Sequence, residues 1–289
     1  MSNHGVYGLR YDLKSRMSGI ASTDTNDDEN MQALCIAASR ILDSATRREF
    51  YPIYQARYFD MPPDDSLLKV DRDLLAVDTF TTQNTGVTVT SGQYYLMTGN
   101  SYNNPPYDRI SQKADSSRPN LLYSGTMQKS QCVTGWWGYH EDWSNAWQNS
   151  QDTVENDPLS ASGTSITVND ADGADLFGNT PRFKVGQLLK IESEYCYVSA
   201  VNTSTNALTV IRAVNGTTAA AHVQNTEIYV YRPMREIEQA AIRLAHWLYG
   251  LGSIGYMEII ATIGEGGIEI PQSAPADVQI SLPSTANGL

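Results

Sequence analysis

The chain has 289 residues, of which 41% are hydrophobic, and a formal net charge of -12 at pH 7. This length suits roughly one to two domains with a sizeable core. The acidic excess excludes a protein that binds nucleic acid through clustered Lys and Arg. It does not exclude a channel protein through which DNA passes without binding. No window approaches the ~20 apolar residues of a membrane span and the start lacks a secretion signal, so we expect a soluble cytoplasmic protein.

The first 30 residues are polar and include the run STDTNDDEN. They indicate an N-terminal arm, residues 1–30, that ends at a helix cap formed by Asp27 or Asp28. From residue 31 to residue 49, apolar side chains recur at steps of three and four, which predicts a helix with one buried face. Pro52 ends this helix, because proline cannot continue it.

Short runs rich in Tyr, Val, Thr and Leu follow, broken by Pro, Asp, Asn and Gly, and they predict strands and hairpins. These runs cover residues 54–60, 67–70, 75–82, 86–91 and 93–99. The stretch NSYNNPPYDRI indicates a turn-rich loop, whereas PNLLYSG and SQCVTGWWGY are typical of extended segments. We therefore expect an α+β first domain in which strands are flanked by helices.

A second group of β-like runs follows a linker without periodicity, QNSQDTVENDPLSASG. The runs TSITVND, QLLKIESEYCYVSAV, ALTVIRAV and TEIYVYRP alternate in polarity or carry β-branched residues and Tyr, and turn residues separate them. About 75 residues are enough for a small antiparallel barrel or sandwich. We interpret residues 156–231 as an inserted all-β domain.

A second helix is predicted from Pro233 to the neighbourhood of Gly250, which stands where a C-cap belongs. Its apolar stripe needs a partner, and the helix at 31–49 is the obvious one. The two helices would form a discontinuous scaffold domain of residues 31–150 and 232–255, a fold of two long packed helices with β-hairpins. Residues 256–289 indicate an extended C-terminal arm that could add strands to a partner.

Signals of catalysis or metal binding are sparse. None of the four histidines lies in a HExxH motif, and no GxSxG motif occurs. His140, Glu141 and Asp142 are consecutive, so they point in different directions in a strand or a helix. The run NDADGAD lacks the later Glu and the flanking helices of an EF-hand, and a β-turn explains it better. We expect no catalytic residue, cofactor or metal, and hence no enzyme.

The stretch CVTGWWGYHEDWSNAW at 132–147 contains four of the five tryptophans. In a strand, Trp137 and Tyr139 share one face and Trp136 lies on the other. Such aromatic residues favour a core or a protein interface, while the alternative is a carbohydrate-binding module with these rings as its platform. The candidate interface residues are Trp136, Trp137, Tyr139, Trp143, Trp147, Tyr256, Ile259, Ile268, Ile270, Val278 and Ile280.

Several motifs occur in a familiar order, namely ASRILDSATRREFYP, YQARYFD, LLKVDRDLLAVDTFTT, QYYLMTGNSYNNPPYDRI, VTGWWGYH and REIEQAAIRLAHWLY. Together they resemble the head-tail connector (adaptor) proteins of tailed bacteriophages over about residues 30–143 and 232–270. In that family the WWGY-like strand runs almost directly into the closing helix, whereas here the β segment at about 157–231 lies between them. Residues 183–222 resemble a small β module of phage structural proteins.

The resemblance implies a structural virion protein that works by shape and contact. It implies a homo-oligomeric ring, usually of twelve subunits, that docks under the portal protein and extends the DNA channel. DNA would pass through without specific binding, and a tail-side neck, stopper or tail protein would dock on the ring. The protein would lie at the head-tail junction of the virion, and in the host cytoplasm during assembly, with residues 256–283 contacting the portal.

Overall fold

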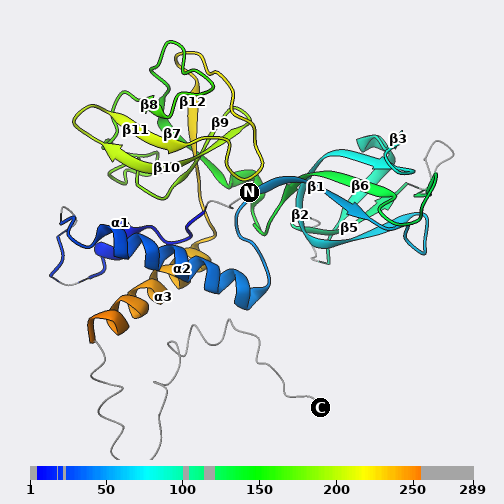
Figure 1. The fold of residues 1–289 in the computed structure, drawn as a ribbon, viewed down its shortest axis with the longest axis horizontal. Helices are drawn as coiled ribbons and strands as arrows, with labels where there is room; N and C mark the ends of the chain where they lie inside the picture. The colour runs from blue at the N-terminus through cyan, green and yellow to red at the C-terminus, as the bar shows by residue number, and fades with distance from the viewer. Residues whose placement is uncertain (1–4, 18, 22–23, 100–103, 114–120, 255–289) are drawn as a thin grey trace, which may run out of the picture.

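The computed structural model describes residues 5–17, 19–21, 24–99, 104–113 and 121–254 (Figure 1). In this part of the chain the fold is mostly β, with two antiparallel six-stranded sheets and three α-helices. The sheets occupy separate parts of the molecule, and the helices lie together beside the second sheet. None of the helices in the described ranges combines the length and apolar character that a membrane span requires.

The helices are α1 (Arg10–Lys14), α2 (Asp28–Thr46) and α3 (Arg235–Ile254). The structure confirms the two long helices that the apolar periodicity of the sequence predicts, and α2 packs against α3. α2 ends where Arg47 adopts a left-handed conformation with φ 56°. α3 continues through Gly250, so the predicted C-cap at that glycine is wrong.

The first sheet has the strand order β1-β6-β2-β5-β4, with β3 paired to β2. Its strands are β1 (Ile53–Phe59), β2 (Leu67–Thr82), β3 (Val87–Thr88), β4 (Tyr94–Met97), β5 (Tyr107–Gln112) and β6 (Gln131–Trp137), and the 3₁₀ turn η1 (Ser91–Gln93) precedes β4. β2 is one strand of 16 residues where the sequence suggested two runs. Register shifts in its pairing with β5 and β6 let this long strand bend.

The second sheet has the order β7-β12-β9-β10-β11-β8. Its strands are β7 (Trp147–Thr153), β8 (Ser165–Thr167), β9 (Leu188–Ile191), β10 (Glu194–Asn202), β11 (Ala207–Ile211) and β12 (Glu227–Tyr231), and the 3₁₀ turn η2 (Trp143–Asn145) leads into β7. β7 pairs with β12 and falls in the stretch without sequence periodicity. The chain therefore enters and leaves this sheet by neighbouring strands.

Three clusters of buried side chains form the core. One cluster lies within the second sheet and its loops, and another lies within the first sheet and its loops. The third combines the N-terminal residues Val6, Tyr7 and Leu13 with α2, α3 and aromatic residues of the second sheet, including Tyr195 and Tyr231. This third cluster joins the N-terminal segment, the helices and the second sheet.

The prediction of an α+β fold built on two long packed helices is wrong. α2 and α3 do contact each other, but the strands of the first sheet bury Leu74, Phe80 and Ile110 in their own cluster instead of covering the helices. The sequence suggested hairpins between neighbouring strands on a helical scaffold. In the structure, strands far apart in the sequence pair with each other, as β1 and β2 do with β6. Pairing between distant strands leaves little trace in local periodicity, which explains the error.

Candidate functional site

The tryptophan-rich stretch 132–147 spans the connection between the two sheets, from β6 to the start of β7. Trp137 belongs to the core of the first sheet, where it is 2% exposed. Its indole N–H donates a hydrogen bond of 3.0 Å to the carbonyl oxygen of Gln55 on β1. Trp137 therefore stabilises the first sheet and is closed to a ligand.

Of the other three tryptophans of this stretch, Trp136 and Trp147 pack on tyrosines of the second sheet, and Trp143 packs on Trp147. The ring of Trp136 stacks on Tyr195 with centroids 4.5 Å apart. Trp147 contacts Tyr195 at 4.6 Å and Tyr231 at 5.2 Å, and Trp143 meets Trp147 edge-on at 6.5 Å. We call these five residues the aromatic junction, because they join β6 of the first sheet to β10 and β12 of the second.

Tyr139 does not share a face with Trp137, contrary to the expectation for a continuous strand. β6 ends at Trp137, and Gly138 adopts φ +140°, a conformation that turns the chain. Tyr139 consequently packs edge-on against Phe50 at 5.8 Å, and the guanidinium of Arg48 lies over its ring at 4.2 Å.

His140 is 6% exposed and fastens the connection to the start of α3. Its Nε2 lies 3.0 Å from the carbonyl oxygen of Arg232, and its Nδ1 accepts the backbone N–H of Asp142 at 3.1 Å. This arrangement requires a neutral ring with the proton on Nε2. Burial lowers the pKa of His140, which agrees with that neutral form. His140 thus has a structural role, because it holds the connection against the chain segment before α3.

The remaining candidate interface residues, Tyr256, Ile259, Ile268, Ile270, Val278 and Ile280, lie outside the described residues. Among the tryptophans and Tyr139, no in-line row of exposed rings forms, because the rings face tyrosines, Phe50 or the sheet core. The described residues also contain no group of three or more His, Cys, Asp or Glu side chains placed to hold a metal ion.

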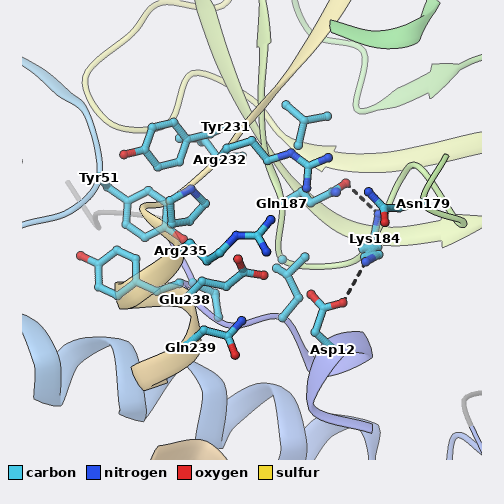
Figure 2. Close-up of a pocket in the computed structure, with 17 residues that line it drawn as sticks. Asp12, Tyr51, Asn179, Lys184, Gln187, Tyr231, Arg232, Arg235, Glu238 and Gln239 are labelled. Atoms are coloured by element: carbon cyan, nitrogen blue, oxygen red, sulfur yellow. Dashed lines mark hydrogen bonds and ion pairs between the residues drawn. The ribbon is translucent and has the colours of Figure 1, made fainter. Parts of the chain in front are cut away.

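A pocket of about 210 Å³ lies next to the aromatic junction, where the N-terminal segment, the second sheet and the start of α3 meet (Figure 2). We call it the junction pocket. Its lining includes Tyr7 and Asp12 from the N-terminal segment, Tyr51, Lys184, Tyr231 and Arg232, and Arg235, Glu238 and Gln239 from α3.

Some charged side chains of the junction pocket have an ion-pair partner, and others do not. Lys184 Nζ lies 2.8 Å from Asp12 Oδ1, and Arg232 bonds to the carboxylate of Asp175 outside the pocket lining. The carboxylate of Glu238 has no hydrogen bond or ion pair within the described ranges. Burial raises the pKa of Glu238, and the nearby charge of Asp12 raises it further, while the surrounding cations act in the opposite direction.

The sequence did not reveal this pocket. Glu238 occurs in the acidic first turn of a predicted helix, where a carboxylate is favourable with or without a ligand. Lys184 and Tyr51 are distant from it in the chain, and their convergence depends on the packing of the N-terminal segment between α2, α3 and the second sheet.

Comparison with models of known protein families gave no match, and comparison with curated proteins gave none either.

Proposed function

We propose that this chain is a structural virion protein, a head-tail adaptor that forms a ring below the portal of a tailed bacteriophage. The ring would extend the DNA channel and present a docking surface to a tail-side neck, stopper or tail protein. The proposal rests on the ordered motifs described above together with the surface of the protein.

The observation that carries the proposal is the distribution of exposed apolar side chains. Large apolar residues are exposed on α2, on the first sheet and on a loop of the second sheet, and they include Ile36, Ile41, Tyr58, Tyr95, Met97, Leu176 and Phe177. Phe177 is 74% exposed. Large apolar side chains at the surface supply contact area for other proteins, and a ring subunit needs contacts with two neighbours, a portal and a tail component.

The loop that carries Phe177 is held rigidly, which suits docking. The carboxylate of Asp175 accepts the backbone N–H groups of Phe177 and Asn179, both at 2.9 Å, and it also binds Arg232. Because these hydrogen bonds fix the loop backbone, the loop loses little backbone conformational entropy when a partner covers Phe177. The acidic composition suits a channel wall, because it repels the phosphates of passing DNA.

The test is the assembly state of the purified full chain, measured by light scattering and by electron microscopy of stained particles. We expect closed rings, or a complex with portal assemblies. The proposal would be overturned if the protein is strictly monomeric, does not bind the portal and is not needed for joining heads to tails. Phe177→Ser should reduce assembly without unfolding the chain, and Val223→Ser, another exposed position with 69% exposure, is the matched control.

A further inference from the structure

The junction pocket contains two polar groups whose hydrogen-bonding capacity is unused. Tyr51 is 4% exposed, yet its hydroxyl has no hydrogen-bond partner in the described part of the chain. Burial raises the pKa of this phenol well above its ordinary value, so the hydroxyl is neutral. Glu238 is half-buried and its carboxylate is likewise unpaired there. Neither group is among the buried polar atoms that lack a partner and are shut off from solvent, because both line the pocket. A ligand in the pocket can therefore replace water as their hydrogen-bond partner.

The positive side chains around the pocket do not meet this need. Asp12 engages Lys184 (Figure 2), and the opposite charges of this pair have opposing effects on the pKa of Glu238. Asp175 and Gln148 engage Arg232. Arg235 is exposed, so water solvates its guanidinium, and no ion pair joins it to Glu238 within the described ranges. Glu238 is therefore a carboxylate of the lining that has cations nearby but no direct hydrogen bond or ion pair within the described ranges.

We infer that the junction pocket binds an organic cation, a guanidinium or primary ammonium group, through the carboxylate of Glu238. Both groups are N–H donors, and a charge-assisted hydrogen bond to a half-buried carboxylate is stronger than one between neutral groups. The hydroxyl of Tyr51 and the side-chain carbonyl of Gln239 are further acceptors in the lining. This inference goes beyond the proposed function and does not depend on ring assembly.

The walls of the pocket suit such a ligand. The rings of Tyr7, Tyr51 and Tyr231 form part of the lining, and aromatic faces attract cations. Tyr7 and Tyr51 stack with centroids 4.7 Å apart, which fixes the wall before a ligand arrives. The volume of about 210 Å³ is below the ~300–1,000 Å³ of sites for drug-sized molecules. It therefore favours a single side-chain-sized group.

The experiment is calorimetric titration of the full chain with L-argininamide, which carries positive charge and no carboxylate. Glu238→Gln removes the charge but keeps the shape, and we expect it to weaken binding about tenfold. Arg235→Gln removes a repelling charge, and we expect it to strengthen binding. Glu236→Gln is the matched control, because Glu236 lies exposed in the same turn and is not part of the lining, and binding should not change.

Tyr51→Phe separates binding from folding. The hydroxyl makes no hydrogen bond in the described ranges, so its removal should leave the thermal unfolding temperature unchanged, while argininamide binding weakens about threefold. Failure of argininamide to bind the full chain would overturn the inference. Weaker binding of argininamide by Arg235→Gln would also overturn it, because removing a positive charge beside a site for a cation should not weaken the binding of a cation.

Two sources can supply the same cationic group, and a second titration distinguishes them. An N-acetylated, C-amidated Gly-Arg-Gly peptide presents the guanidinium as a protein side chain does. Binding of both probes with the same loss in Glu238→Gln supports the site and indicates a side chain of another protein. Binding of argininamide alone supports the site and indicates a free small molecule. Either result stands whether or not the purified chain forms rings.

Discussion

The two sheets of this protein are alike in strand number and differ in where they place their charged side chains. In the second sheet the side chains of Glu194, Arg212 and His222 are 0%, 6% and 1% exposed. In the first sheet the pair Arg57–Asp71 is 24% and 59% exposed. A buried ionic group must be fully satisfied, whereas exposed pairs contribute little. The stability of the second sheet should thus depend on a few polar contacts.

Glu194 is the centre of that network. Its carboxylate accepts two hydrogen bonds of 2.6 Å from Arg212 and the backbone N–H groups of Ala213 and Ala220. His222 places Nε2 at 2.8 Å from Glu194 and Nδ1 at 2.8 Å from Glu192. Burial acts to raise the pKa of Glu194, but these hydrogen bonds hold it below its ordinary value. Glu194 thereby fixes the start and the middle of the loop between β11 and β12.

Glu194→Ala should produce the largest loss. The loop amides would lose their acceptor, and the buried charge of Arg212 would lose its carboxylate partner and keep only carbonyl acceptors. We expect the free energy of unfolding of the second sheet to fall by about 3–5 kcal/mol. Urea unfolding followed by amide hydrogen exchange measures this sheet by sheet. Asp71→Ala, which breaks the exposed pair with Arg57, is the control, and it should cost under about 1 kcal/mol. If Glu194→Ala and Asp71→Ala lose the same free energy of unfolding, the two sheets do not differ in their dependence on charged side chains.

Trp136→Ala should come next, because it removes the main ring contact of β6 with the second sheet. We expect a loss of about 3 kcal/mol from the truncated aromatic contact. The two sheets should also unfold in separate calorimetric transitions. Tyr95→Ala on the exposed face of β4, with 58% exposure, is the control. A single transition in Trp136→Ala would show that the aromatic junction does not couple the sheets. If the adaptor function holds, Trp136→Ala and Trp143→Ala also weaken assembly.

Gly216→Ala tests the second contact between the sheets. Gly216 has φ +85°, and an added Cβ would lie 1.9 Å from the carbonyl oxygen of Tyr54 on β1. We expect a loss of about 2–3 kcal/mol from backbone strain and the clash together. Gly178→Ala is a close match, because Gly178 has φ +80° and nothing within 4 Å of the added atom. The difference between the two variants isolates the contact with β1, and equal losses would mean that this contact is unimportant.

Asp43 should give the smallest effect, and it reports on the helices that lie beside the second sheet. Burial raises the pKa of Asp43 to about 6, although Tyr7 and Arg40 partly offset it. The folded state therefore binds a proton at a higher pH than the unfolded state, and this group adds stability as the pH falls. We expect a gain of about 1 kcal/mol between pH 7 and pH 5. Asp43→Asn should abolish this gain in the free energy of unfolding, measured by urea unfolding at each pH. If the pH dependence of the variant equals that of the wild type, Asp43 is not the group responsible.

Local features were predictable from the sequence, while features that depend on distant pairing were not. The apolar stripes of α2 and α3 are visible in the sequence because helix periodicity is local. The prediction that Gly250 ends α3 failed, since a glycine is tolerated within a helix at a modest cost. β5 was missed because its partners β2 and β4, not its own composition, specify it.

The candidate site shows the same limit. The tryptophans drew attention by number, but the sequence could not show that Trp136 and Trp137 enter different cores. No sequence motif singled out Glu194 or His222, although this carboxylate and imidazole, far apart in the chain, meet in the fold. Their burial follows from the closure of the loop after β11, which no local pattern encodes.

The neighbouring positions of β7 and β12 have a mechanical consequence. Arg232 N–H donates to the carbonyl oxygen of Ala146 at 2.8 Å, and His140 bonds to the carbonyl oxygen of Arg232, so the two chain crossings into the second sheet are clasped at their base. Tension between the first sheet and α3 would therefore act directly on these two hydrogen bonds. Once these hydrogen bonds break, β7 and β12 would separate one hydrogen bond at a time, starting at the pair Trp147 and Tyr231.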